Sequence, residues 1–130
     1  MLLDKKSSKP IVVIGAGGHA KVVAEALISS GRKILGFVSP DKPRDSPFFG
    51  STILGDDHIF EKFSPDRIEL ANGVGALPFQ NIRWELVKKF EMQGYYFTKV
   101  IHPSAEISAN VNISHGAQIM AGAVLQPGSQ

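Results

Sequence analysis

A six-residue repeat in the last thirty residues constrains the fold more than any other feature of this sequence. Large aliphatic residues recur at every sixth position, as Ile101, Ile107, Ile113, Ile119 and Leu125. Small or β-branched residues precede the later members by two positions, as Ala105, Val111, Ala117 and Ala123. Neither the 3.6-residue period of a helix nor the two-residue period of a strand produces this spacing. The repeat predicts a parallel β-helix, in which three six-residue segments form one coil.

The position of the repeat in the chain adds an expectation about length. Residues 101–118 would complete one coil, and residues 119–130 would begin the next. Because a solenoid needs neighbouring coils to bury its faces, we expect the hexads to continue in a longer protein. The alternative is a short flap that folds against the preceding residues.

The first hundred residues alternate between apolar runs and helical periodicity. The run IVVI at 11–14 predicts a strand, and it leads through the glycine turn GAGGHA into a helix over residues 21–31. Further elements are predicted as strands at 33–38, 67–75 and 95–101, a loop at 39–50, a short helix beginning near Asp56 and a long helix over 81–94. Gly31 and Gly94 would end the two long helices.

Strands that alternate with helices predict parallel βα units and an α/β fold with helices on the faces of the sheet. We therefore expect an α/β sheet domain over residues 1–100 and a β-helix segment over residues 101–130. The turns after the first and third strands should open together at the carboxyl edge of the sheet, where such folds bind ligands.

Charge and composition exclude several classes of protein. With 14 basic and 12 acidic residues, the net charge of +2 is too small for a nucleic-acid-binding surface. The absence of cysteine excludes disulfides and thiolate metal sites, and the consecutive residues Asp56, Asp57 and His58 are not expected to converge on a metal. No apolar run approaches the roughly 20 residues that span a bilayer, and no signal peptide is recognised, so we expect a cytoplasmic protein with no membrane partner.

Two glycine turns carry the candidate binding residues. In GAGGHA, Gly15 and Gly17 permit a tight turn whose following helix amides face an anion, although the same glycines would also serve a purely structural turn. His19 and Lys21 follow in the first helical turn, where a solvated surface role is equally open. In ANGVG, the Asn72 amide suits a base or a sugar hydroxyl, and an ordinary turn remains the alternative.

A nicotinamide cofactor is disfavoured by the residues that follow the second strand. A dinucleotide site uses an acidic residue there to bind the ribose. The chain has Val38 and Ser39 at this point, and the nearest carboxylate, Asp41, lies beyond Pro40.

The motifs together resemble one family. IVVIGAGGHAKVVAEAL, ANGVG, VIHPSA and QIMAGAVLQPG occur in the order found in the bacterial sugar acyltransferases of the sialic-acid O-acetyltransferase and PglD type. The resemblance implies a Rossmann-like domain that holds a nucleotide-linked sugar, and a left-handed β-helix that trimerises and binds acetyl-CoA as co-substrate. The implied reaction is acetyl transfer to an amino or deoxy sugar, or to a sialic-acid-like sugar, for surface glycans.

The resemblance also implies which residues hold the UDP-sugar acceptor. They are Gly15, Gly17, Gly18, His19, Lys21, Ser39, Asp41, Asn72, Gly73, Val74 and Gly75. The general base of the family is a histidine paired with an acid in a coil after the MAGAV segment, and His115, followed by Gly116, does not match it. We therefore assign no catalytic residue, expect that histidine beyond Gln130, and expect these 130 residues to be inactive alone. A non-catalytic nucleotide-sugar-binding module is the alternative function, ahead of an NAD-dependent oxidoreductase.

Overall fold

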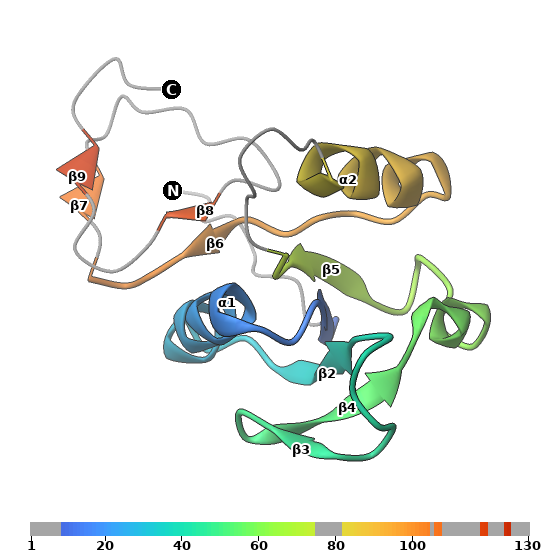
Figure 1. Cartoon of the computed structure of the whole chain (residues 1–130). Coiled ribbons are helices and arrows are strands. Elements are labelled where there is room, and N and C mark those ends of the chain that lie inside the picture. Colours follow the sequence, from blue (N-terminus) through green and yellow to red (C-terminus); the bar gives the residue numbers. More distant parts are fainter. Residues whose placement is uncertain (1–8, 75–81, 105, 108–117, 120–123, 126–130) are drawn as a thin grey trace.

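The protein is described by a computed structural model that covers residues 9–74, 82–104, 106–107, 118–119 and 124–125 (Figure 1). The elements of the first hundred residues are β1 (Ile11–Ile14), α1 (Gly18–Ser29), β2 (Ile34–Val38), β3 (Pro47–Phe48), β4 (Ser51–Gly55), the 3-10 helix η1 (Asp57–Glu61), β5 (Glu69–Asn72) and α2 (Ile82–Met92). They are followed by β6 (Val100–Ile101), β7 (Glu106–Ile107), β8 (Gln118–Ile119) and β9 (Val124–Leu125).

The central sheet has five strands in the order β3-β4-β2-β1-β5. β4, β2, β1 and β5 are parallel, and β3 pairs with β4 in the antiparallel sense. The α/β class is confirmed, but the sheet is mixed rather than wholly parallel. The antiparallel strand lies at the edge, where Pro47 removes no hydrogen bond from an interior ladder.

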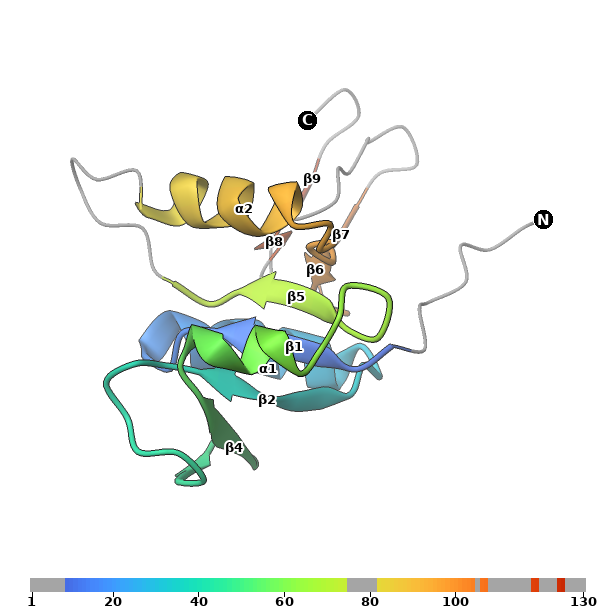
Figure 2. The same ribbon diagram turned by 90° about the vertical axis from the view of Figure 1, so that its right-hand side faces the viewer.

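Apolar layers cover both faces of the sheet. On one face α1 packs Ala20, Val23 and Leu27 against strand residues that include Val13 and Phe37. On the other face η1 and α2 contribute Ile59, Phe60 and Phe90 to a cluster with Val12, Leu70 and Phe97. Figure 2 shows this two-sided cover, with α1 behind the sheet. Alternate residues of β1 therefore face opposite layers, which explains why all four are buried.

Both long helices end at the predicted glycines. Gly31 has φ 81° and Gly94 has φ 94°, the left-handed conformation that glycine adopts without a steric penalty. At the end of α1 the amides of Gly31 and Arg32 donate to Ile28 and Leu27, which is the Schellman pattern. The predicted helix boundaries at these two glycines are confirmed.

Two predictions for irregular segments were wrong. The stretch 39–50, expected as a loop, contains β3, and β4 follows it without having been predicted. Phe49 and Gly50 form the two-residue turn between these strands, with φ values of 43° and 80°. The prolines of this stretch led to the loop prediction. An edge strand tolerates proline, so they do not exclude the hairpin.

The predicted strand at 95–101 is only partly formed. Phe97 makes a single parallel bridge to Leu70, and regular strand geometry begins at β6. The backbone still lies beside β5, since the Thr98 amide donates to the Leu70 carbonyl at 2.9 Å.

The four short strands after residue 99 pair across a constant separation. Val100 pairs with Gln118 and Ile101 with Ile119, and Ile107 pairs with Leu125, all in parallel. Each partner lies 18 positions further along the chain, which is three hexads. β6 also contacts α1, because the Ser30 hydroxyl donates to the Ile101 carbonyl at 2.7 Å.

Among the described residues, no helix has both the length and the apolar character that crossing a bilayer requires.

Candidate functional site

The carboxyl ends of the parallel strands place the two predicted glycine turns side by side. β1 lies between β2 and β5, so the turns that follow β1 and β5 are neighbours. The Gly15 amide donates to the Val38 carbonyl of β2, and the Gly73 amide donates to the Ile14 carbonyl of β1, both at 2.8 Å. The expected meeting of these turns at one sheet edge is therefore confirmed.

Close packing explains why glycine occupies both turns. A Cβ atom added to Gly15 would lie 2.9 Å from the Gly73 carbonyl oxygen, and Gly15 has φ 107°. A Cβ atom added to Gly73 would lie 2.9 Å from the Ile14 carbonyl oxygen and 3.0 Å from the Cα of Ala20. Backbone atoms cannot move aside as a side-chain end can, so only glycine fits at either position.

The start of α1 is exposed and carries backbone N–H donors. Gly17 caps the helix in an extended conformation with no side-chain hydrogen bond, and no acidic residue lies in the first turn. Gly17 and Gly18 are exposed, and no atom of the described residues lies within 4 Å of a Cβ placed on either. The first amides of a helix lack intrahelical acceptors and carry partial positive charge. This end of α1 can therefore accept an anion at close range.

The second turn contains a buried side-chain donor, the Nδ2 of Asn72. Asn72 is 4% exposed, and its Oδ1 accepts a hydrogen bond from the Val74 amide at 2.9 Å. Its Nδ2 has no hydrogen-bond partner among the described residues. An unsatisfied buried amide costs about 1–3 kcal/mol, so an acceptor supplied by a ligand would be favourable here. Gly75 lies outside the described residues.

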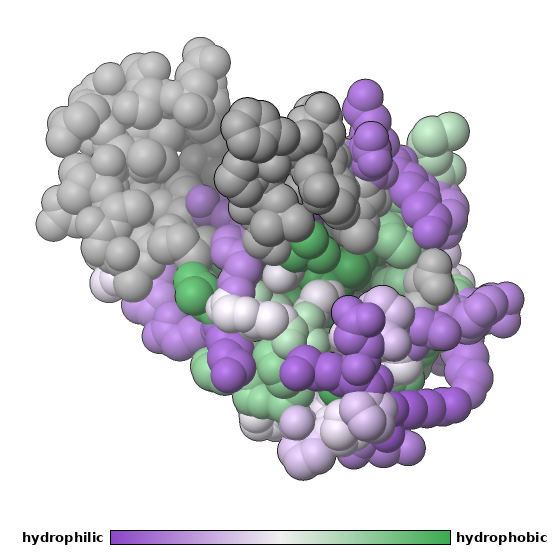
Figure 3. All heavy atoms as spheres, viewed as in Figure 1, coloured by the Kyte–Doolittle hydropathy of each residue, from purple (hydrophilic) through white to green (hydrophobic). Residues whose placement is uncertain are grey.

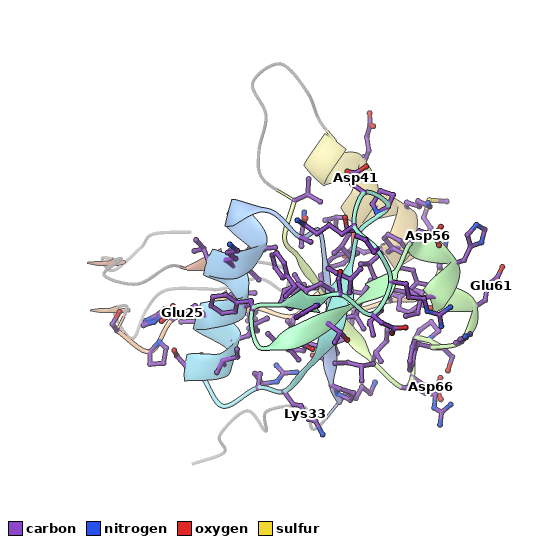
Figure 4. The ribbon with its side chains drawn as sticks, turned by 60° about the horizontal axis from the view of Figure 1, so that its bottom comes forward. Glu25, Lys33, Asp41, Asp56, Glu61 and Asp66 are labelled. Atoms are coloured by element: carbon purple, nitrogen blue, oxygen red, sulfur yellow. The ribbon has the colours of Figure 1, made fainter. Side chains whose placement is uncertain are left out.

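A pocket of about 400 Å³ lies further along the carboxyl edge of the sheet, between the loop after β2 and the β4–η1 connection. Its charged lining consists of Lys42, Arg44, Lys62, Asp56 and Glu61, together with His58. Figure 3 shows hydrophilic residues around β4 and η1, and Figure 4 labels Asp56 and Glu61 of the pocket lining.

The two residues expected after β2 differ in their surroundings. Ser39 is 7% exposed, lines the pocket and accepts a hydrogen bond on its Oγ from the Asp41 amide at 3.3 Å. The Asp41 side chain is exposed. No carboxylate occupies the last residue of β2 or the position after it, as the sequence had indicated.

Phe48 contacts two lysines, one from α1 and one from the pocket lining, and this arrangement was not predicted. The ammonium nitrogens of Lys21 and Lys42 each lie 5.6 Å from the centre of its ring. A cation within about 6 Å of an aromatic face is attracted by the ring quadrupole. Lys21 comes from α1 and Lys42 from the pocket wall, so one aromatic ring holds two positive charges between the two parts of the site.

Gln118 of β8 is the second residue that was not predicted for the site. Its Oε1 lies 2.9 Å from His19 Nε2, and its Nε2 donates to the Asn72 carbonyl oxygen at 2.6 Å. The sequence offered only a weak signal, namely a polar residue directly before Ile119, one of the aliphatic hexad positions. The repeat segment therefore reaches both glycine turns.

No group of three or more metal-ligating side chains converges within the described parts of the chain. Asp56 instead caps η1, since its carboxylate accepts a hydrogen bond from the His58 amide at 3.0 Å. This is the helix-start role expected for that residue.

Comparison with known proteins decides the family. Residues 10–90 match the model of the PglD N-terminal domain. The chain belongs to the PglD-like sugar acyltransferases. The matched residues include β1 to β5, and therefore both glycine turns and the pocket. No curated protein matches the chain.

Solved structures of sugar N-acetyltransferases share this fold. A variant of perosamine N-acetyltransferase from Caulobacter crescentus, in complex with CoA and GDP-perosamine, is 30% identical with a TM-score of 0.81. The acetyltransferase domain of PglB from Neisseria gonorrhoeae, in complex with acetyl coenzyme A, is 31% identical with a TM-score of 0.81. The matches cover 93% and 94% of this chain but 56% and 58% of those chains. This PglD-like chain therefore spans little more than half the length of the structures it matches.

Proposed function

We propose that this PglD-like protein binds a nucleotide-linked amino sugar along the carboxyl edge of its sheet, as the acceptor-binding part of a sugar acetyltransferase. The observation that supports this most strongly is the pair of packed glycine turns, with the exposed start of α1 on one side and, on the other, the buried Asn72 Nδ2, which has no partner among the described residues. The pocket continues the same edge toward β4.

The diphosphate is assigned to the start of α1. The exposed Gly17 and Gly18 let phosphate oxygens approach the helix amides, which form a ready anion site. Lys21 and Lys42, held at the Phe48 ring, supply two positive charges beside it. These charges match the two negative charges of a nucleoside diphosphate ester.

The nucleoside is assigned to the pocket, and the sugar to the turns. A volume of about 400 Å³ is within the range of small-ligand sites, and Ser39 lines the pocket and accepts a hydrogen bond from the Asp41 amide. His19 and Asn72 then remain for hydroxyl or amino groups of the sugar. The Caulobacter relative was crystallised with a GDP-linked sugar, so both guanine and uracil are candidates for the nucleotide base.

The residues after 100 are proposed to begin the second domain of such an enzyme. Parallel pairing at a separation of 18 residues is what the coil of a hexapeptide β-helix requires, and it supports the division at residue 100. By likeness to relatives that were crystallised with CoA or acetyl coenzyme A, we assign acetyl-CoA as the co-substrate and a left-handed, trimeric β-helix as its site. The acceptor would be a bacterial amino sugar for surface glycans.

Calorimetric titration and amide NMR test the binding site directly. We expect GDP- or UDP-linked amino sugars to bind and to shift the amides of residues 15–19 and 72–74, whereas NADH should not bind. Lys42→Gln should weaken the affinity several-fold, because each lost phosphate contact removes a charge-assisted bond. Lys33→Gln is the matched control, since Lys33 is exposed before β2, at the opposite end of the strands in Figure 4. Binding of NADH at these turns would refute the proposal.

A further inference from the structure

Gln118 joins the two glycine turns to the hexapeptide segment. Its side-chain amide lies between His19, 99 positions earlier, and Asn72, 46 positions earlier. Its backbone is held by parallel pairing with Val100 of β6. One half-buried side chain therefore contacts both turns that form the proposed sugar site.

The direction of these hydrogen bonds is determined by the Asn72 carbonyl. A backbone carbonyl oxygen can only accept, so the group 2.6 Å from it must be the Gln118 NH2. The Gln118 Oε1, which can only accept, then faces His19 Nε2 at 2.9 Å. The proton of this hydrogen bond must therefore be carried by His19 Nε2. In the neutral imidazole, Nδ1 then has the free lone pair.

We infer that Gln118 is a positioning residue that holds His19 as the Nε2-protonated tautomer, with Nδ1 as a hydrogen-bond acceptor for the ligand. No described residue donates a hydrogen bond to His19 Nδ1. An acceptor at that atom selects a hydroxyl or amino group of the sugar, rather than a phosphate oxygen. The tautomer follows from the contacts alone, whereas the sugar contact rests on the proposed function.

The two hydrogen bonds of the Gln118 side chain also link the proposed second domain to the proposed sugar site. Removing the Gln118 amide frees the His19 ring and also leaves the Asn72 carbonyl without this donor. The orientation of the turn that carries the buried Asn72 side chain thus depends on a residue outside the family-matched region 10–90.

Nitrogen-15 NMR of the histidine rings tests the tautomer without any ligand. The protein is measured near pH 8, above the ordinary imidazole pKa of about 6.5, and His19→Gln assigns the His19 signals. We expect a protonated Nε2 and an unprotonated Nδ1 in the wild type. Gln118→Glu, which keeps the acceptor, should retain this tautomer, whereas Gln118→Met should give a mixture.

A purely structural role for Gln118 would lower the melting temperature of both variants and leave the tautomer unchanged. An unchanged tautomer in Gln118→Met would therefore overturn the inference. Gln93→Met, at an exposed glutamine after α2, is the matched control and should change neither the tautomer nor the affinity.

Calorimetry with a GDP- or UDP-linked amino sugar then tests the ligand contact. We expect Gln118→Met to raise the Kd about tenfold, or 1.4 kcal/mol. If the tautomer changes while the Kd does not, the assignment of Nδ1 to the sugar is overturned. If the wild type binds no nucleotide sugar, the proposed function fails, while the NMR result on the tautomer still decides the role of Gln118.

Discussion

Gly15 and Gly73 are packed so closely that the Cβ of any other residue at position 15 would lie 2.9 Å from the Gly73 carbonyl oxygen. The two residues belong to turns that follow different strands, 58 positions apart in the chain. Their contact brings the start of α1 and the Asn72 side chain to one edge of the sheet. Glycine at these positions therefore serves the geometry of the site as well as the turns.

Gly15→Ala should lower the free energy of unfolding by at least about 2 kcal/mol, because strained backbone at positive φ alone costs about 1–3 kcal/mol. The clash with Gly73 adds to that strain. Denaturant unfolding at neutral pH measures the loss.

Gly17→Ala is the matched control for stability. Gly17 has φ −114°, and a Cβ atom there would have no neighbour within 4 Å in the described part of the chain, so alanine fits without strain. A Gly15→Ala variant as stable as Gly17→Ala would show that the contact with Gly73 relaxes freely, contrary to our expectation.

Arg32 and Glu69 form an ion pair that is nearly excluded from water. Their side chains are 11% and 9% exposed, and the two charged atoms lie 3.0 Å apart. Removing one partner of a buried pair typically costs about 3–5 kcal/mol, because the other charge remains buried and unpaired. Glu69→Leu and Arg32→Met should each show such a loss in denaturant unfolding.

The double variant Arg32→Met/Glu69→Leu measures the energetic coupling between the two charges. It should lose less stability than the sum of the single variants, since neither charge is left buried alone. Lys33→Met, at the exposed neighbour, should change stability little. Simple additivity of the two single variants would contradict an energetic coupling between Arg32 and Glu69.

Tyr95 should contribute a pH-dependent part of the stability. Burial raises the pKa of its hydroxyl, which donates to the carbonyl oxygens of Phe60 and Phe63. The unfolded chain then ionises first, so this contribution is complete below about pH 10 and is lost as the pH rises through the folded-state pKa.

Tyr95→Phe should cost about 1–2 kcal/mol at neutral pH, because the two carbonyl oxygens lose the single hydroxyl donor that they share. Unfolding curves measured between neutral and alkaline pH should show a smaller alkaline decline for this variant than for the wild type. Tyr96→Phe, at a side chain that is 45% exposed, should keep the wild-type decline. An equal decline in all three proteins would argue against a raised pKa at Tyr95.

Phe48 should affect nucleotide-sugar affinity through Lys21 and Lys42. Replacing its ring by leucine removes two cation–π contacts of about 0.5–1 kcal/mol each, and we expect the Kd to rise roughly fivefold. Calorimetry measures this change, and affinity for the nucleoside without phosphates should change much less. Phe63→Leu is the control, since Phe63 packs on the opposite face of the sheet. An equal effect of both variants would indicate a general loss of packing.

Local patterns were sufficient for several parts of this fold. The apolar run of β1, the helical spacing of α1 and the glycines at 31 and 94 act through near neighbours, and these elements lie where the sequence predicted them. The β3–β4 hairpin was missed because the prolines of the segment indicated a loop, and because Phe49 adopts φ 43°, a conformation that its residue type does not indicate.

The sequence by itself determined the α/β class, the two glycine turns and the 18-residue spacing of the later strands, because each depends on short-range periodicity. Only the tertiary structure decided that Lys21 and Lys42 both contact the Phe48 ring, and that Gln118 contacts both His19 and Asn72. These contacts join residues up to 99 positions apart. No local periodicity encodes them, because they depend on how the strands and α1 pack in three dimensions.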